Sequence, residues 1–242
     1  MLDLLAFDLD GTLADTEALK AQSYGWAARR LRPDLDPAAV EAAYGDYVGR
    51  SREEIASGLL DRFGLADAAR RHDGSVEPWQ SYVGIRLERY RGLLADADRV
   101  RRHARAGAAL VPEARRFARA VALVTTTDRQ NADLVLAGLG LAGAFDTVVT
   151  ADDVEDTKPD PEAYALAVSR LGADPARSLA VEDSRAGALG AIRAGLRVLV
   201  APDRVTREGV RALVEAGALP AADVLDPSEL EDAVRRAAEE AG

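Results

Sequence analysis

The chain has 242 residues, which is long enough to bury a full hydrophobic core, either as one large domain or as a core with one insertion. Its composition, 48% hydrophobic and 30% charged, is typical of a globular protein, and its apolar runs are too short to span a bilayer, so we expect no membrane partner. It contains no cysteine, which excludes disulfides, thiolate metal sites and a cysteine nucleophile.

The formal net charge is -10, from 31 basic and 41 acidic residues, and this charge repels nucleic acid. We interpret the arginine-rich stretch at residues 99–105 as a solvated helix face and expect no nucleic-acid partner. The N-terminus runs directly into an apolar stretch, without the basic region and cleavage site of a secretory signal. We therefore expect a cytoplasmic protein, as a monomer or a homodimer.

Short apolar runs bounded by turn residues predict five buried strands. They are Leu2 to Phe7, Val121 to Val124, Thr147 to Thr150, Ser178 to Val181 and Arg197 to Ala201. Helical patterns lie between the later runs and close at glycines, which are typical stop signals. These helices are predicted at Gln130 to Gly138, Pro161 to Leu171 and Ala186 to Ala194. Alternation of strand and helix predicts an α/β fold with a doubly wound parallel sheet.

Residues 16–95 contain amphipathic helical segments and no comparable strand. We interpret them as a helical domain inserted into a core formed by residues 1–15 and 96–242. Within that core, the Ala- and Arg-rich residues from about 95 to 120 predict a helix. A last strand and helix are predicted at residues 221–240, with Pro227 at the first helical position.

Polar side chains follow four of the predicted strands, at the edge of an open parallel sheet where ligands bind. They are Asp8 and Asp10 after the first, Thr125, Thr126 and Thr127 after the second, Asp152, Asp153 and then Lys158 after the third, and Glu182, Asp183 and Ser184 after the fourth. Each of them alone is equally well explained as a turn or helix-cap residue. Their convergence on one sheet edge favours a shared site.

Asp8 and Asp10 are two positions apart on an extended segment, so both side chains face the same side. Several carboxylates in one pocket cannot all ionise without a cation, and carboxylate oxygens select Mg²⁺, which we expect between Asp8 and Asp183. A metal, the Lys158 ammonium and the Thr125 hydroxyl together suit a phosphoryl group. One carboxylate can then act as the nucleophile and another as general acid and base.

Four short motifs together resemble those of the haloacid dehalogenase-like superfamily of phosphatases and phosphomutases. They are "DLDGT" at residues 8–12, Thr125 after "VALV", Lys158 in "KPDPEAY" and "VEDS" at residues 181–184. In addition, "DTE" at 15–17 and "VGRSREEI" at 48–55 resemble the helical cap of the subfamily that contains phosphoglycolate phosphatase and β-phosphoglucomutase.

The resemblance implies a Rossmann-like core with an inserted helical cap domain. It also implies a Mg²⁺-dependent phosphatase that hydrolyses a small phosphorylated metabolite, phosphosugar or phosphoglycolate-like, through a phosphoaspartate. Asp8 would be the nucleophile and a metal ligand. Asp10 would be the general acid and base and would offer its main-chain carbonyl to the metal, while Asp183 completes the metal site with Glu182 close behind it.

For the phosphoryl group, the resemblance implies that Thr125 binds its oxygens, helped by backbone amides near Leu9, Asp10 and Thr126. Lys158 would bridge the phosphoryl group and Asp8. The cap would choose the substrate, and its candidate contacts are Lys20, Gly49, Arg50 and Arg52.

Many cap-bearing relatives have a histidine where this chain has Lys20. This difference weakens the interpretation as a β-phosphoglucomutase-like phosphomutase, which stays open as an alternative, and it favours a substrate with an anionic group near the cap. A further alternative is a non-catalytic receiver-like signalling module, which also surrounds Mg²⁺ with acidic residues, a threonine and a lysine. Receiver modules place two acidic residues side by side on the first strand, whereas here they are spaced D-x-D.

Overall fold

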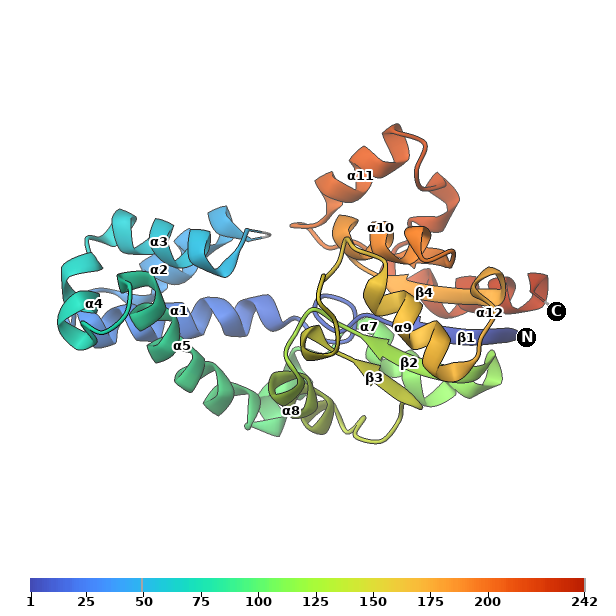
Figure 1. The fold of residues 1–242 in the computed structure, drawn as a ribbon, viewed down its shortest axis with the longest axis horizontal. Coiled ribbons are helices and arrows are strands. Elements are labelled where there is room, and N and C mark those ends of the chain that lie inside the picture. Colours follow the sequence, from blue (N-terminus) through green and yellow to red (C-terminus); the bar gives the residue numbers. More distant parts are fainter. Residues whose placement is uncertain (49, 242) are drawn as a thin grey trace. The chain divides into compact units, whose positions relative to one another are not determined.

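The computed structural model describes residues 1–48 and 50–241. The chain forms two units (Figure 1), one made of Met1–Asp15 with Val100–Gly242 and the other of Thr16–Arg99. The first unit, called here the core unit, contains the whole sheet. The second, called here the helical unit, is one continuous segment inserted into it.

The sheet of the core unit has five parallel strands in the order β3-β2-β1-β4-β5. They are β1 (Leu2–Phe7), β2 (Ala118–Val124), β3 (Thr147–Val149), β4 (Ser178–Glu182) and β5 (Arg197–Val200). The chain runs outward from β1 through β2 to β3, and then crosses back to β4 on the other side of β1. The predicted doubly wound parallel sheet is confirmed, and its switch point lies at the end of β1, between β2 and β4.

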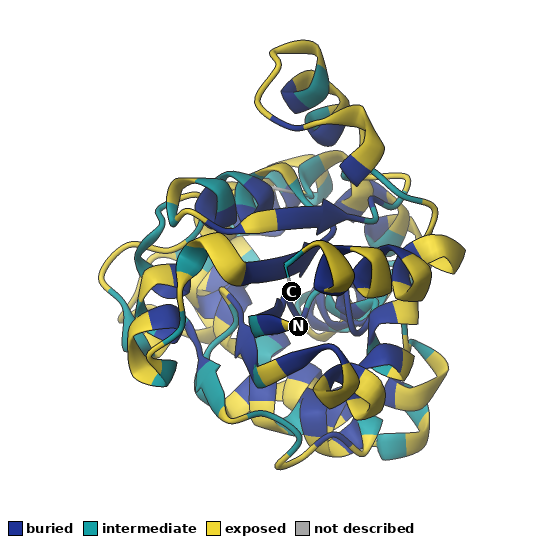
Figure 2. Ribbon diagram, turned by 90° about the vertical axis from the view of Figure 1, so that its right-hand side faces the viewer, coloured by how far each residue is buried: buried dark blue, intermediate teal, exposed yellow. Residues whose placement is uncertain are grey.

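Strand β1 is buried on both faces, with Leu4, Leu5, Ala6 and Phe7 fully inaccessible to solvent. Helices cover both faces of an all-parallel sheet, so its central strands carry continuous apolar runs instead of alternating ones. Figure 2 shows this distribution, because the buried residues gather along the strands and the exposed ones lie on the outer helix faces. A fully buried β1 gives the residues that follow it a rigid support.

The helices of the core unit follow the predicted stop signals. Helices α8 and α9 end at Gly140 and Gly172, which have left-handed φ angles of 74° and 59°. The helices of this part of the chain are α6 (Ala97–Arg102), α7 (Ala106–Leu110), α8 (Arg129–Leu139), α9 (Glu162–Leu171), α10 (Arg185–Arg193), α11 (Arg207–Glu215) and α12 (Leu230–Glu240).

The helix predicted over residues 95–120 is confirmed only in part. The structure has α6 and α7 there, then a 3₁₀ helix (Val111–Arg116), and β2 begins at Ala118. The break falls at Ala104 and Arg105 because these residues pair with another part of the chain: Ala104 bridges Ala14 in antiparallel fashion, and the Arg105 N–H donates to the Leu13 carbonyl at 2.9 Å. A long-range pairing of this kind overrides local helix propensity.

The strand predicted near residue 221 is also absent from the described chain. Residues Ala221–Asp223 form a 3₁₀ turn, and only Val224 bridges Val200 beyond it. The chain cannot extend this pairing because Asp226 already accepts a hydrogen bond from the Ser228 N–H and opens a 3₁₀ turn at Pro227, which leads into α12.

The helical unit contains α1 (Thr16–Leu31), α2 (Pro37–Tyr44), α3 (Arg52–Phe63), α4 (Ala66–His72) and α5 (Pro78–Leu94), with no strand among its described residues. Its core holds three buried tyrosines, with the Tyr24 ring centroid 5.5 Å from that of Tyr44 and 5.4 Å from that of Tyr82. Across residues 1–48 and 50–241, no helix combines the length and the apolar character that crossing a bilayer requires.

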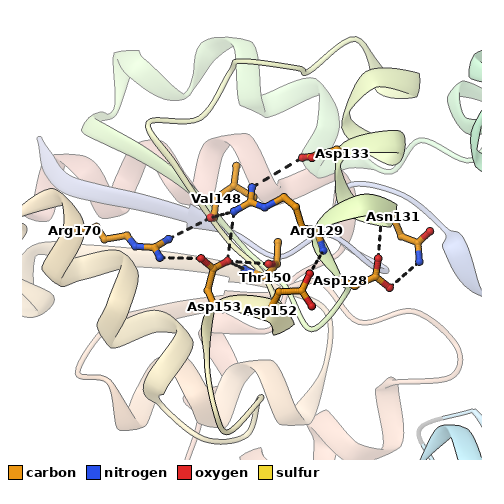
Figure 3. A network of polar contacts seen from close by, with 9 residues as sticks. All are labelled: Asp128, Arg129, Asn131, Asp133, Val148, Thr150, Asp152, Asp153 and Arg170. Carbon is orange, nitrogen blue, oxygen red and sulfur yellow. Dashed lines mark hydrogen bonds and ion pairs between the residues drawn. The ribbon is translucent and has the colours of Figure 1, made fainter.

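Strand β3 is an edge of the sheet, and a network of arginines covers it (Figure 3). The Val148 carbonyl accepts from Arg129 Nη2 at 2.8 Å and from Arg170 Nη1 at 3.4 Å. Asp153 binds Arg170 at 2.8 Å and accepts from the Thr150 N–H at 2.9 Å. Burial alone would raise the pKa of Asp153, but the hydrogen bonds from Arg170 and Thr150 outweigh it and lower the pKa to about 2. The network therefore protects the edge and fixes the turn after it.

Replacing Asp153 by alanine tests this network. We expect Asp153→Ala to lower the free energy of unfolding at pH 7 by about 2 kcal/mol, because a half-buried acceptor of several hydrogen bonds is lost. The folded pKa lies below the ordinary value, so this stabilisation is present above pH about 4 and disappears as the pH falls through about 2. Urea denaturation at pH 7 and pH 3 measures it. Asp133→Ala, on an exposed partner of Arg129, is the matched control, and equal losses in the two variants would contradict the expectation.

Candidate active site

The end of β1 places Asp8 and Asp10 beside the end of β4. The Asp8 N–H donates to the Val181 carbonyl at 3.0 Å, Asp8 is 6% exposed, and Leu9 packs into the core. Gly11 turns the chain with a φ of 93°, and a Cβ at this position would collide with the Asp183 carboxylate. Glycine is thus required here both for its backbone conformation and for its lack of a side chain.

Lys158 joins the ends of three strands through its buried ammonium group. Its Nζ lies 2.7 Å from Asp8 Oδ1, 2.6 Å from Glu182 Oε1 and 2.7 Å from the Val124 carbonyl oxygen. All three N–H donors are therefore in use, so a bond to a phosphoryl oxygen requires one acceptor to be exchanged. Burial lowers the pKa of Lys158, but the charges of Asp8 and Glu182 outweigh it and raise the pKa overall. The ammonium stays charged.

Three buried carboxylates surround this ammonium. Oxygens of Asp8, Glu182 and Asp183 all lie within 4.8 Å of one another. Burial, and after it the neighbouring carboxylates, raise the pKa of Asp8 to about 7 and that of Asp183 to about 9, although Lys158 opposes both shifts. Within the described chain, Asp8 Oδ2 is buried and has no hydrogen-bond partner. The excess negative charge and the unpaired oxygen fit a hard divalent cation such as Mg²⁺.

Two of the three threonines after β2 have hydroxyl groups placed by hydrogen bonds. Thr125 is 2% exposed, and its Oγ1 accepts from the Thr127 N–H at 3.1 Å, so its own O–H remains to donate. Thr127 Oγ1 donates to the Asp10 carboxylate. Thr126 is exposed. Sequence reasoning gave Thr127 no function of its own, although its place two residues after Thr125, just beyond β2, was a usable signal.

The comparisons with known proteins agree with this geometry. The model of the haloacid dehalogenase-like hydrolase family matches residues 2–195. The chain belongs to this family. Within the family it is an enzyme of the phosphatase type, as the sequence predicts.

Individual relatives of this haloacid dehalogenase-like hydrolase cover most of its length. Protein CbbY from Rhodobacter capsulatus is 33% identical over 85% of this chain and 88% of that protein. The phosphorylated carbohydrates phosphatase of Thermotoga maritima is 28% identical over 90% of this chain and 93% of that protein. Two crystal structures of CbbY from Rhodobacter sphaeroides are also similar, and each comparison covers 86% of this chain and 89% of the CbbY chain. The complex with phosphate has a TM-score of 0.64 and is 29% identical in sequence. A variant in complex with xylulose-1,5-bisphosphate has a TM-score of 0.63 and is 28% identical.

Tyr164 belongs to the same cluster but is missed by the sequence analysis. Its O–H donates to Glu182 Oε1 at 2.6 Å, and its ring centroid lies 4.9 Å from Lys158 Nζ. Burial and the carboxylates raise the pKa of Tyr164, so the phenol remains protonated and can donate. A tyrosine in a helix usually indicates core packing, and only its position six residues after Lys158 could have pointed to the site.

Asp152 and Asp153 were expected at the shared sheet edge, and the structure contradicts this. Asp152 Oδ2 accepts from the Arg129 N–H at 2.9 Å, and Asp153 is held by Arg170 and Thr150 (Figure 3). The reason is the position of β3 at the edge of the sheet, where the Arg129 N–H holds Asp152 and the guanidinium groups of Arg129 and Arg170 pair with Asp153. Of the three site residues expected after β3, Lys158 is the one that contacts the carboxylate cluster of Asp8, Glu182 and Asp183.

The expected cap contacts belong to the helical unit. Lys20 on α1 forms an ion pair of 2.7 Å with Glu17, which also accepts from the Tyr44 O–H at 2.6 Å. Arg52 is the exposed first residue of α3, and the guanidinium of Arg50 lies 5.3 Å from the Tyr47 ring centroid. Gly49 lies outside the described residues.

The carboxylate cluster predicts that the metal-free protein becomes less stable as the pH rises. The folded pKa values of Asp8 and Asp183, about 7 and about 9, exceed the ordinary value. Their stabilising contribution is therefore complete below pH about 4 and is lost as the pH rises through 7 and 9. We expect the melting temperature in EDTA to fall between pH 5 and pH 9, and Mg²⁺ to raise it most at the alkaline end.

Differential scanning fluorimetry of the wild type and Asp183→Asn measures this effect. The variant removes one like charge, so in EDTA its melting temperature should depend less on pH and should gain little from Mg²⁺. An equal gain from Mg²⁺ in the two proteins would show that Asp183 does not hold the cation.

Proposed function

We propose that this protein is a Mg²⁺-dependent phosphatase that hydrolyses a phosphorylated carbohydrate through a phosphoaspartate on Asp8. The observation that carries the proposal is the unequal environment of the two Asp8 oxygens. Oδ1 is held by Lys158, whereas Oδ2 is buried and has no hydrogen-bond partner among the described residues. The carbohydrate class is supported by the name of the Thermotoga relative and by the bisphosphate bound to a CbbY variant.

In the first step, the Asp8 carboxylate attacks phosphorus and forms an acyl phosphate while the bond from phosphorus to the ester oxygen breaks. The Asp10 carboxyl group gives its proton to the departing alkoxide, which leaves as the alcohol. Thr127 donates to the Asp10 carboxylate and thereby fixes its orientation.

In the second step, the Asp10 carboxylate takes a proton from a water molecule whose oxygen attacks the acyl phosphate. The bond from phosphorus to Asp8 breaks, inorganic phosphate forms and the Asp8 carboxylate is regenerated. Asp10 recovers its proton in the same step, so the cycle needs no other acid or base.

Oxygens of Asp8 and Asp183, with the Asp10 main-chain carbonyl, would hold Mg²⁺, and Glu182 lies beside them. When bound, the ion supplies positive charge that neutralises the carboxylates and the phosphoryl oxygens. The free O–H of Thr125 and the ammonium of Lys158 donate to the same oxygens, the latter after exchange of one acceptor.

We further propose that the helical unit, Thr16–Arg99, is the cap that selects the substrate. It contains an arginine, Arg86, that is 6% exposed and stacked against the rings of Tyr24 and Tyr90 at 4.9 and 5.1 Å. Within the described residues, Arg86 Nε and Nη1 have no hydrogen-bond partner. A buried guanidinium with unused donors is costly, and an anionic group of the substrate would satisfy it.

Two expected cap residues act electrostatically on Tyr24, whose ring contacts this arginine. Burial raises the pKa of the Tyr24 phenol, and the charges of Arg86, Arg52 and Lys20 oppose this shift. The helical unit therefore carries positive charge around this tyrosine, which supports a substrate with a second anionic group, such as a sugar bisphosphate.

Asp8→Asn tests the chemistry. We expect hydrolysis of p-nitrophenyl phosphate with Mg²⁺ to fall on the order of a thousandfold or more, because the amide is not a nucleophile. Asp152→Asn, at a strand end outside the cluster, is the matched control and should retain activity.

Product analysis with a sugar phosphate separates a phosphatase from a phosphomutase. A phosphatase releases inorganic phosphate, whereas a phosphomutase transfers the phosphoryl group to another position of the sugar. Activity that survives in Asp8→Asn or in EDTA would overturn the proposal.

Arg86→Met tests substrate selection. We expect kcat/KM for xylulose-1,5-bisphosphate to fall about 10- to 100-fold, because a hydrogen bond to a charged group is worth about 1.5–3 kcal/mol. Turnover of p-nitrophenyl phosphate, which has no second anionic group, should change less than about twofold. Arg89→Met, on the exposed face of the same helix, is the control. Equal losses on both substrates would argue against a role in selection.

A further inference from the structure

The three buried carboxylates of the cluster differ in how completely the protein satisfies them. Glu182 Oε1 accepts from Lys158 and from Tyr164, both at 2.6 Å. Its Oε2 accepts from the Asp183 N–H at 3.3 Å and the Ser184 O–H at 3.5 Å. Asp8 Oδ2, in contrast, has no such partner in the described chain. Glu182 therefore needs no cation to compensate its burial.

Glu182 is also held in place from the side of α10. Residue 187, in the first turn of that helix, is glycine, and a Cβ there would overlap the Glu182 carboxylate. The space that the carboxylate fills exists only because this residue has no side chain. Gly187 on one side and Tyr164 on the other leave the carboxylate one position, next to the lysine.

Tyr164 contacts both members of the ion pair. Its hydroxyl donates to the carboxylate, and its ring faces the ammonium at 4.9 Å. The residue is fully buried, in the first turn of α9. Without the hydroxyl, Glu182 would lose one of the two donors on Oε1, and the ammonium would lose a fixed partner.

We infer that Tyr164 is a positioning residue that holds Glu182 as the anchor of Lys158, and that Glu182 serves the lysine instead of the cation. This inference rests on the proposed function, in which Lys158 orients Asp8 for attack. A correctly placed ammonium keeps Asp8 Oδ1 fixed and so sets the orientation of the whole carboxylate that attacks phosphorus.

Tyr164→Phe removes the hydroxyl and keeps the ring, and Tyr82→Phe is the matched control. Tyr82 is also fully buried and donates to a main-chain carbonyl, that of Tyr24, at 2.9 Å in the helical unit. With p-nitrophenyl phosphate and Mg²⁺, we expect Tyr164→Phe to lower kcat about 10-fold with KM within about twofold. Tyr82→Phe should lower the melting temperature by a similar amount and leave kcat unchanged. Gly187→Ala displaces the carboxylate from the other side and should lower kcat as well.

A second measurement does not depend on activity. A buried ammonium with three acceptors exchanges its protons slowly, so we expect a Lys158 side-chain signal in ¹H–¹⁵N NMR, assigned by its loss in Lys158→Ala. The signal should persist in Tyr82→Phe and broaden in Tyr164→Phe. If it stays unchanged in Tyr164→Phe, the inference is wrong. If the wild type has no Mg²⁺-dependent activity, the proposed function fails, while the NMR comparison still decides the positioning role.

Discussion

The buried contacts of Lys158 connect the three strand ends that form the candidate site. One ammonium, 4% exposed, binds Asp8 at the end of β1, the carbonyl at the end of β2, and Glu182 at the end of β4. Such a group is stable away from water only if its partners are fixed, because removing one partner leaves an uncompensated charge. The parallel sheet fixes them, since its fully buried strands end side by side at the switch point.

One ammonium does not balance three carboxylates, and this imbalance makes the site reactive. Raised pKa values at Asp8 and Asp183 mean that folding alone disfavours their ionised forms. Under the proposed function, a bound cation would reverse this preference, so metal binding and formation of the nucleophile would be coupled. Lys158 holds Asp8 Oδ1, which leaves Oδ2 for that cation.

The sequence predicted those features that depend on local periodicity. Apolar runs located all five strands, and D-x-D spacing located the residues at the end of β1. It failed where distant segments decide the structure: Ala104 leaves a helical pattern to bridge Ala14, and Asp153 turns away from the site to bind arginines of two helices. Tyr164 was missed for the same reason, because its partner Glu182 is 18 residues away and local pattern cannot distinguish it from a packing residue.

Each of the two units contains buried polar atoms that the folded chain leaves unsatisfied. Asp8 Oδ2 in the core unit lacks a partner of positive character, and Arg86 Nε and Nη1 in the helical unit lack acceptors, in each case among the described residues. These are opposite requirements, and each has a free-energy cost that the folded chain alone does not recover. A divalent cation such as Mg²⁺ would satisfy the first, and an anionic group of the substrate would satisfy the second. Under the proposed function, reaction and selection depend on different units, so the ester that is cleaved can change without any change in the residues that cleave it.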